Sequence, residues 1–400
     1  MGDILFADGR RYSREWLDTH EAEAQEVFRA HKHTYPLCLC QRDGVPMHIR
    51  ELSRTGKLYL ARMPMTGPMH RGDCPSYEPI HGKAEEQARE AGLIEELGDG
   101  RVVFKVDVGF NIREPAAVSS PPSPAELPQM VQNPQPRLGL LAMMQFLWEQ
   151  AELHHWHPKM EGRRRYKQVY DRLTEAASRI LVKGVPLRQR LYIPEPFYKE
   201  QANEIMMRRL EAISRLGRSS AGKRRRFLVM GQLRELEESS ENVRLRFAQA
   251  GNDLSVVMPR SAWERMLKRW GVKVPEEDSD LGLWGMFLIE HFKGATLHSR
   301  AAAVMQTTAH YIPVFRPAEA SLAYGLVDSR RRFIKMLAID GRPSENGPAF
   351  LLTDVAEKPV PLYISNRELP AETAVDEWYW HTDRDDMWPP LPVPQSRRSH

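Results

Sequence analysis

Residues 38–74 contain every cysteine of the chain, beginning with Cys38-Leu-Cys40 and, after a hairpin-like segment, closing with His70-Arg-Gly-Asp-Cys74. Two closely spaced thiols and a His-x3-Cys pair supply the ligand types that structural zinc sites hold in a closed tetrahedral shell. On an extended strand Cys38 and Cys40 would project from one face, because side chains alternate along a strand. Gly72 would let the chain bend so that His70 and Cys74 converge. We therefore predict structural zinc bound by Cys38, Cys40, His70 and Cys74.

Other uses of the cysteines fit less well. The chain has 3 cysteines, an odd number that suits a disulfide framework poorly. A bridge between extended i and i+2 cysteines would lie near the upper limit of disulfide Cα separation. Unliganded or redox-active thiols remain an alternative, and His31, His33 and His48 are reserve ligands. Iron in place of zinc also stays open, since a Cys3His set does not choose between them.

The chain divides into four parts, and the mixture of helices and strands predicts a multidomain α+β protein. Residues 1–112 form a zinc-binding α+β domain, with a hairpin of strands 45–52 and 57–63, a helix over 84–91 and a strand over 101–110. Residues 113–137 contain 7 prolines and form a Pro-rich linker. Residues 138–222 are a basic helical region, with helices over 138–153, before 181 and over 199–216. Residues 223–400 form a mixed α/β domain with a tail rich in tryptophan and proline.

Basic residues are concentrated in the middle of the chain. The formal net charge is +4, yet residues 159–226 contain 19 Lys and Arg against 7 Asp and Glu. Such a patch is typical of proteins that bind nucleic acid, although solvated helix faces also explain it. DNA is the favoured partner, and protein partners are possible. The predicted phosphate-binding residues are Arg163, Arg164, Arg165, Lys167, Lys223, Arg224, Arg225 and Arg226.

Two functional classes are disfavoured. Residues 217–223 resemble the start of a phosphate-binding loop, but Arg224 follows where that motif needs Ser or Thr, and a helix precedes the segment where a strand is required. No apolar run approaches the ~20 residues that span a bilayer. The first residues lack the basic and apolar regions of a signal peptide, so we expect a cytoplasmic bacterial protein.

Several short motifs, taken in order, resemble an uncharacterised bacterial family, the domain of unknown function 1173 family. Those beyond the cysteine and histidine pairs are Leu147-Trp-Glu149, Arg330-Arg-Arg-Phe-Ile-Lys335, Leu352-Thr-Asp354, Trp378-Tyr-Trp380 and Pro389-Pro-Leu-Pro392. The resemblance covers nearly the whole chain. It implies a setting near integrative and conjugative elements, that is, mobile DNA, and it implies no activity.

The last part of the chain also resembles a restriction-endonuclease-like core, with a helix over 318–327 and strands over 333–339, 349–353 and 360–364. Such nucleases hold Mg²⁺ with an Asp on one strand and Glu-x-Lys on the next. The corresponding positions here read Pro348-Ala-Phe350 and Leu362-Tyr-Ile364, so both acidic positions are absent. Asp354 and Glu319 lie nearby without completing the constellation, and no catalytic residue is predicted.

Three functions follow from these features. The first is a non-enzymatic nucleic-acid-associated protein of a mobile element, with structural zinc and a nuclease-like domain that lacks its catalytic acids. The second is a metal-dependent nuclease that uses Asp354 or the histidines of residues 154–157. The third is a protein-interaction scaffold whose arginines contact acidic protein surfaces. Whether the protein is an enzyme is left open, with the non-enzymatic interpretation favoured.

Overall fold

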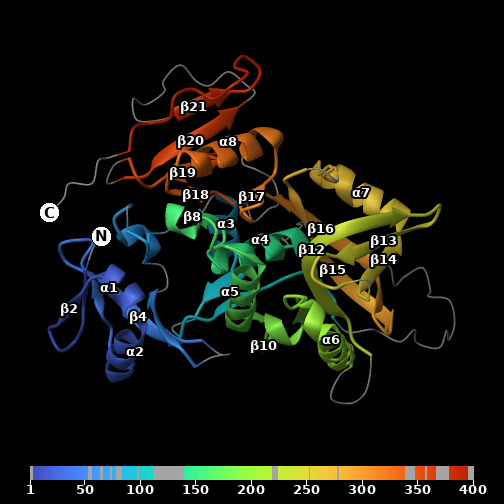
Figure 1. Cartoon of the computed structure of the whole chain (residues 1–400), viewed down its shortest axis with the longest axis horizontal. Helices are drawn as coiled ribbons and strands as arrows, with labels where there is room; N and C mark the ends of the chain where they lie inside the picture. Colours follow the sequence, from blue (N-terminus) through green and yellow to red (C-terminus); the bar gives the residue numbers. More distant parts are fainter. Residues whose placement is uncertain are drawn as a thin grey trace, which may run out of the picture.

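A computed structural model describes most of the chain as a mixed α+β protein (Figure 1). The described residues are 3–52, 56–63, 66–72, 74–77, 83–97, 99–110, 138–218, 224–251, 253–276, 279–337, 347–355, 358–365 and 378–394. The predicted linker over 113–137 and Lys223 lie outside them. None of the helices in these ranges is long and apolar enough to cross a membrane.

The N-terminal unit, residues 3–77, is a small sheet covered by two helices. Its strands are β1 (Ile4–Leu5), β2 (Arg11–Tyr12), β3 (Leu37–Cys38), β4 (Val45–Glu51) and β5 (Leu58–Arg62), in the order β2-β1-β3-β4-β5. Helices α1 (Arg14–Thr19) and α2 (Glu21–Ala30) precede β3, and the 3-10 turn η1 (Gly67–Met69) follows β5. Val45, Met47 and Ile49 alternate into the core, as the period of a half-buried strand requires. The predicted hairpin is β4 and β5.

A central core joins residues that the sequence assigned to two domains. It contains α3 (Lys83–Glu90), β6 (Ile94–Glu96), β7 (Val102–Phe104), α4 (Leu140–Gln150), α5 (Tyr166–Arg179), β9 (Ile180–Val182) and β10 (Val185–Pro186). The sheet order is β10-β9-β7-β6, and β7 pairs in parallel with β9. Phe104 packs on Phe146 with ring centroids 4.8 Å apart. The expected boundary at residue 112 therefore falls within one sheet, and the compact N-terminal unit ends near residue 77.

A closed β-barrel follows, which the sequence did not predict. Its strands are β12 (Phe227–Glu238), β13 (Asn242–Phe247), β14 (Ser255–Pro259), β15 (Gly282–Lys293) and β16 (Thr296–Thr307), and α7 (Arg260–Trp270) connects β14 to β15. The order is β12-β13-β14-β16-β15, and β15 pairs with β12 to close the barrel. Only the β14–β16 pair of these five strands is parallel. A Cβ on Gly231 would lie 2.7 Å from the ring of Phe247 on the neighbouring strand β13, so glycine there leaves room for this ring in the core.

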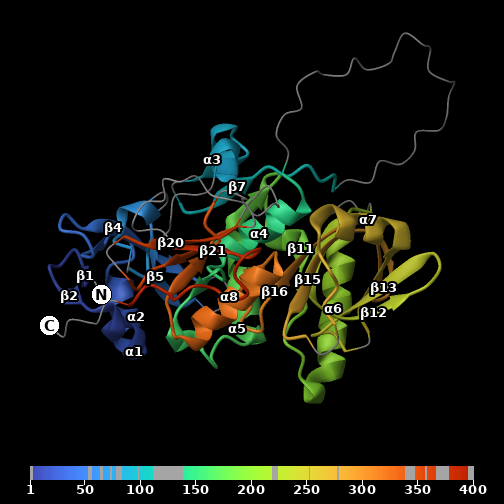
Figure 2. The same cartoon turned by 90° about the horizontal axis from the view of Figure 1, so that it is seen from above.

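Short elements attach the barrel to the central core. Strand β11 (Leu191–Tyr192) pairs in parallel with β12, and β17 (Pro313–Val314) pairs with β16. Helix α6 (Ala202–Leu216) contacts β11, and the 3-10 turns η4 (Leu187–Gln189) and η5 (Lys199–Gln201) precede it in the chain. In both views the N-terminal unit and the barrel lie at opposite ends of the long axis, with α4 and α5 between them (Figures 1 and 2).

The C-terminal sheet contains β18 (Phe333–Lys335), β19 (Phe350–Leu352), β20 (Val360–Ser365) and β21 (Trp378–His381), preceded by α8 (Pro317–Asp328). These positions agree with the predicted helix and three strands. Its order is β21-β20-β19-β18-β8, where β8 (His155–Trp156) comes from the middle region and is followed by the 3-10 turn η3 (Pro158–Met160). Strands β18, β19 and β20 are antiparallel, and β21 is parallel to β20.

Candidate functional site

The structure brings together the four metal ligands predicted from the sequence. One ligand atom from each of Cys38, Cys40, His70 and Cys74 lies within 4.8 Å of the other three, and all four residues are buried. The Sγ atoms of Cys38 and Cys74 are 3.7 Å apart, too far for a disulfide. The Nδ1 atom of His70 lies 3.3 Å from the Sγ of Cys40 and 3.6 Å from that of Cys74. This buried Cys3His cluster could hold a metal ion.

Two tight turns position these ligands. Cys38 ends β3, whereas Cys40 lies in the turn that follows. The two thiols are therefore not on one extended strand, the arrangement considered from the sequence. His70 follows η1, and Cys74 donates its backbone N–H to the carbonyl of Arg71. The pairing of Cys38 with Ile4 and Val45 anchors the first turn in the sheet.

The distances between the ligand atoms match a tetrahedral site. With metal–sulfur and metal–nitrogen distances of about 2.3 Å and 2.0 Å, a tetrahedron places two sulfurs about 3.8 Å apart and a sulfur and a nitrogen about 3.5 Å apart. The observed separations of 3.7 Å, 3.3 Å and 3.6 Å lie close to these values. The donor set is thus already arranged for one ion.

Neighbouring groups favour a thiolate in this cluster. Hydrogen bonds from Cys40 and Cys74 lower the pKa of the Cys38 thiol, and the charge of Arg14 adds to this shift. The Arg14 guanidinium lies 3.6 Å from the Cys38 sulfur and donates to the Ser76 hydroxyl at 2.7 Å. Arg14 thus acts as an outer partner that orients and stabilises a ligand, as such groups do in metal sites.

The reserve histidines lie elsewhere. His31 contacts Asp8 at 3.4 Å and packs on Phe6. His48 lies in β4, where burial, with the charges of Arg50 and Arg179, lowers its pKa to about 4. Among the described residues, the histidines of 154–157 do not belong to any group of three potential metal ligands.

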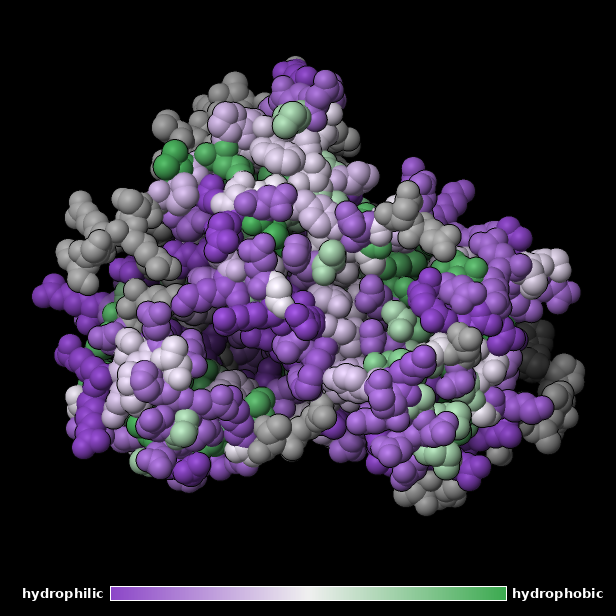
Figure 3. Space-filling view, in the orientation of Figure 1, coloured by the Kyte–Doolittle hydropathy of each residue, from purple (hydrophilic) through white to green (hydrophobic). Residues whose placement is uncertain are grey.

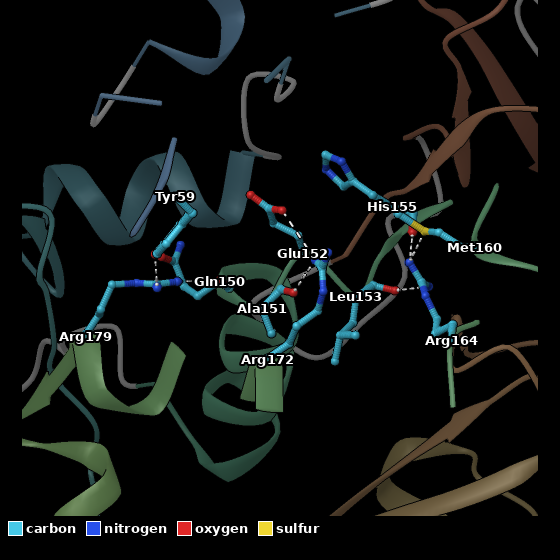
Figure 4. A network of polar contacts seen from close by, with 10 residues as sticks. All are labelled: Tyr59, Gln150, Ala151, Glu152, Leu153, His155, Met160, Arg164, Arg172 and Arg179. Atoms are coloured by element: carbon cyan, nitrogen blue, oxygen red, sulfur yellow. Dashed lines mark hydrogen bonds and ion pairs between the residues drawn. The ribbon is translucent and has the colours of Figure 1, made fainter. Parts of the chain in front are cut away.

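The predicted basic residues differ in what their side chains contact. Arg163, Arg165, Lys167 and Arg224 are exposed, and Lys167 pairs with Asp171. Arg164 instead points inward, where it donates to the carbonyls of Leu153 and His155 and to the Met160 sulfur (Figure 4). Burial lowers the pKa of Arg164 to about 9. The geometry therefore assigns Arg164 to holding the chain around β8 and not to phosphate contact.

We expect Arg164→Ala to lower the free energy of unfolding by about 3 kcal/mol, because charge-assisted hydrogen bonds and packing are removed at a buried site. The exposed neighbour Arg163→Ala is the matched control and should change stability by less than about 0.5 kcal/mol. Urea denaturation of both variants measures the difference. Equal stabilities would contradict the structural role of Arg164.

The second basic group lies where α6 ends and β12 begins. Arg225 donates to the carbonyl of Leu216 at 2.6 Å, and Arg226 lies 3.2 Å from Glu290. These two side chains therefore already have partners in the fold. Of the described members of this group, the exposed Arg224 is the one most available to a ligand.

The carboxylates considered for a nuclease site are engaged in ion pairs. Asp354 accepts two hydrogen bonds from the Arg331 guanidinium, at 3.0 and 2.8 Å. Glu319 is fully buried and lies 3.0 Å from Lys335 and 3.1 Å from Arg316. The strand positions where nucleases carry acids are occupied by Ala349, which follows Pro348, and by Leu362, and both residues are buried. The described residues of this sheet therefore do not form a carboxylate cluster for Mg²⁺.

Sequence reasoning missed a polar outer face on the barrel. Two rows of paired residues cross β12, β13, β14, β16 and β15. The rows are Glu237-Arg244-Val257-His298-His291 and Glu235-Arg246-Ser255-Thr296-Lys293. A signal was available in the sequence, because Val243, Leu245 and Phe247 alternate with Arg244 and Arg246. The three apolar side chains point into the core, so the two arginines between them lie on the other face of the strand. We call these ten residues, of which Val257 is apolar and Ser255 is buried, the outer barrel face.

Known proteins provide a family assignment and little else. A solved structure described as the "Crystal structure of S. pombe Stn1-ten1 complex" is similar over 26% of this chain and 69% of that chain, at 16% identity and a TM-score of 0.16. That score supports no conclusion. No curated protein matches the chain. The family model described as "Protein of unknown function (DUF1173)" matches residues 13–388. Because this match spans nearly the whole sequence, the chain belongs to the DUF1173 family.

Proposed function

We propose that this protein is a non-enzymatic nucleic-acid-binding protein of a mobile genetic element, with DNA as the favoured ligand. The outer barrel face is the observation that carries the proposal. The mobile-element setting follows from the family resemblance. The proposal includes a structural zinc ion and a C-terminal nuclease-like sheet without catalytic acids.

The strand order of the barrel supports nucleic-acid binding. The first three strands in the chain, β12, β13 and β14, are neighbours in the sheet. A helix connects the third strand, β14, to the fourth, β15. The fifth strand, β16, pairs in parallel with β14. This is the order of the oligonucleotide/oligosaccharide-binding fold. In that fold the face of the second and third strands binds the ligand. Fold alone does not establish function, so the side chains on that face carry the argument.

The outer barrel face has the chemistry of a single-strand binding surface. Arg244 and Arg246 project from β13, the second strand, and Lys293 lies at the far end of the Arg246 row. His291 and His298 stack with ring centroids 4.3 Å apart. Cations neutralise phosphates, and flat rings offer a surface on which bases stack. Both arginines are paired, since Glu235 and Glu237 contact Arg246 and Glu237 also lies 3.7 Å from Arg244. Unlike Arg226, they stand together on one strand of the binding face, and a phosphate would replace these exposed carboxylates as their partner.

We expect the double variant Arg244→Gln/Arg246→Gln to bind single-stranded DNA about tenfold or more weakly at physiological salt. For each phosphate that the variant no longer neutralises, the slope of log K against log salt should also become shallower by about 0.7. Fluorescence anisotropy with a labelled oligonucleotide measures both quantities. Arg265→Gln, an exposed arginine on α7, is the control for removal of one charge from the same barrel.

A second double variant, Arg163→Gln/Arg165→Gln, tests the basic residues predicted from the sequence. If it weakens binding and the barrel variant does not, the ligand binds around α5 and the outer barrel face is not the site. If both variants weaken binding, the strand contacts both surfaces. Wild-type affinity in the barrel variant would contradict the proposed site.

Zinc is the proposed ion of the Cys3His cluster. Three thiol sulfurs and one imidazole nitrogen are soft and borderline donors that suit zinc in a closed tetrahedral site. Burial of all four ligands leaves the ion a structural role, since a catalytic zinc keeps an open position.

The order of α8, β18, β19 and β20 supports the nuclease-like assignment of the C-terminal sheet, because a helix followed by three strands is the order on which the resemblance rests. The pairing of Glu319 with Lys335 and of Asp354 with Arg331 supports a structural use of its carboxylates. Cleavage of DNA in Mg²⁺ or Mn²⁺ would favour the nuclease alternative. Binding to proteins without salt-dependent binding to nucleic acid would favour the scaffold alternative.

A further inference from the structure

A large cleft separates the N-terminal unit from the central core. Its volume is about 660 Å³, within the range of about 300–1,000 Å³ that small-molecule sites occupy. Helix α1, strand β5 and residues 74–77 line one side, and β8, η3 and α5 line the other. Figure 3 shows this hollow, rimmed by hydrophilic side chains. The N-terminal unit that forms one side of it lies at the opposite end of the long axis from the barrel (Figure 1).

Cations outnumber anions in the described lining of this cleft. Among those residues, eight are Lys or Arg and five are Asp or Glu. Part of the negative charge is already paired, since Glu96 lies 3.0 Å from Arg89 and Glu152 lies 3.4 Å from Arg172. Because Arg172 is itself a lining residue, its pair with Glu152 removes one charge of each sign. The described lining keeps an excess of positive charge, which attracts ligands of negative charge.

Two arginines meet at Tyr59 in the wall of the cleft. Arg179 donates to the Tyr59 hydroxyl at 2.9 Å and to the Gln150 carbonyl at 3.1 Å (Figure 4). Arg50 also hydrogen-bonds with Tyr59, and burial together with the charges of Arg179 and Arg62 lowers the pKa of Arg50. These two guanidinium groups come from different parts of the fold, β4 and α5, and converge on one point.

Within the described ranges, Arg50 lacks the carboxylate partner that a partly buried arginine ordinarily has. No described carboxylate forms an ion pair with it, and its Nε atom is buried without a hydrogen-bond partner. Its guanidinium lies directly over Gly100, where a Cβ would come within 2.1 Å of a terminal nitrogen. The fold thus places this guanidinium beside that of Arg179, which pairs with Glu175 at 3.4 Å. One carboxylate beside two cations leaves an excess of positive charge, which a bound anion stabilises.

We propose that this cleft binds the phosphate group of a nucleotide, held between Arg50 and Arg179. Guanidinium groups match phosphate oxygens through paired hydrogen bonds, which makes phosphate the anion that this geometry favours. The volume accommodates a nucleoside beside the phosphate, and Tyr59 and Tyr77 provide rings at the wall. A free nucleotide and the phosphorylated end of a nucleic-acid strand share this chemistry. The site is distinct from the outer barrel face and does not depend on it.

Isothermal titration calorimetry on the full-length protein tests the proposal with three probes. These are ADP, a single-stranded oligonucleotide with a 5′-phosphate, and the same oligonucleotide without the phosphate. ADP binding would identify free nucleotides as the ligand. Tighter binding of the phosphorylated oligonucleotide than of its unphosphorylated form, without ADP binding, would identify a strand end. If neither ADP nor the 5′-phosphate adds binding at millimolar concentration, the proposal is wrong.

Arg50→Gln and Arg179→Gln should each weaken binding of the phosphate-bearing probe at least about tenfold, because each removes a charge-assisted hydrogen bond. Arg29→Gln, an exposed arginine on α2 away from the cleft, is the matched control and should bind as wild type. Arg244→Gln/Arg246→Gln should leave ADP binding unchanged, which separates this site from the barrel. Undiminished binding in both cleft variants would overturn the proposal.

A competition measurement covers the case in which a cleft variant does not fold. Pyrophosphate added to the wild-type protein should displace the bound probe, while chloride at equal ionic strength should displace it less. Equal displacement by both salts would show a general charge effect and would contradict a phosphate site.

Discussion

Cys74→Ser is expected to remove the bound metal and to unfold the N-terminal unit. The cluster is closed and buried, so a missing thiolate has no replacement among the described ligands. The binding free energy of structural zinc is about 10–16 kcal/mol in small peptides at pH 7, and it contributes directly to folding. We therefore expect residues 3–77 to be destabilised by several kcal/mol. Metal analysis and limited proteolysis of the full-length chain measure the two effects.

His33→Ala provides the matched control, since His33 is exposed, lies close in sequence and is outside the cluster. Its metal content and protease resistance should equal those of the wild type. Zinc recovered in one equivalent from the wild type would identify the ion, whereas iron would correct the identity and keep the site. Unchanged metal content in both Cys74→Ser and Cys38→Ser would contradict the assignment of the ligands.

Lys335→Met is expected to destabilise the C-terminal sheet by about 3–5 kcal/mol, the usual effect of leaving a buried charge without its partner. Lys335 and Glu319 are 2% and 1% exposed, and their charged atoms are 3.0 Å apart. Lys335 also donates to the carbonyls of Met336 and Ala349. Hydrogen exchange in β18 and β19 measures the local decrease in stability.

The double variant Glu319→Gln/Lys335→Met is the control, because removing both charges avoids an unpaired buried ion. It should be more stable than Lys335→Met alone. If the double variant is the less stable of the two, the pair does not act as a coupled unit. A Lys335→Met protein as stable as wild type would contradict the account of the pair altogether.

The same pair predicts a pH dependence. Burial alone would raise the pKa of Glu319, but the charges of Lys335 and Arg316 hold it below its ordinary value. The ionised carboxylate therefore contributes stability above its unfolded pKa, and that contribution is lost as the pH falls through its folded pKa. Acid unfolding of the C-terminal sheet should be less steep in Glu319→Gln than in the wild type. Identical acid unfolding profiles would rule out this contribution.

The Cys3His cluster was predictable because its residue types are chemically distinctive and few. One residue separates Cys38 from Cys40 and three separate His70 from Cys74, so few other ligand sets were available. The structure brings these same four residues together. The local backbone was less predictable, since Cys40 lies in a turn and not on a strand with Cys38. Ligand identity thus follows from residue type, whereas the turn geometry depends on the pairing of β3 with β1 and β4.

The barrel shows where sequence patterns stop being informative. The apolar stretches 227–233, 243–248 and 254–258 favour strands by their residue types, and β12, β13 and β14 overlap them. Their closure depends on the pairing of β12 with β15, which joins residues about fifty or more positions apart and leaves no local signal. The outer barrel face could not be predicted for this reason. The proximity of Arg50 to Arg179 could not be predicted either, because these residues lie on segments that are far apart in the sequence and come together only in the folded protein. Nothing in the sequence shows that Arg164 differs from its neighbours Arg163 and Arg165. Only the structure shows that its side chain points inward and donates to the Leu153 carbonyl.

Fluorescence anisotropy of the metal-analysed wild-type protein with single-stranded DNA, from about 50 to about 300 mM salt and with and without Mg²⁺, tests the central claim most directly. Four phosphate contacts would give a slope of log K against log salt of about −3, and the oligonucleotide should remain intact on a gel. Cutting of the strand would contradict the non-enzymatic function. Absence of salt-dependent binding to any of single-stranded DNA, double-stranded DNA or RNA would contradict nucleic-acid binding itself and direct attention to protein partners.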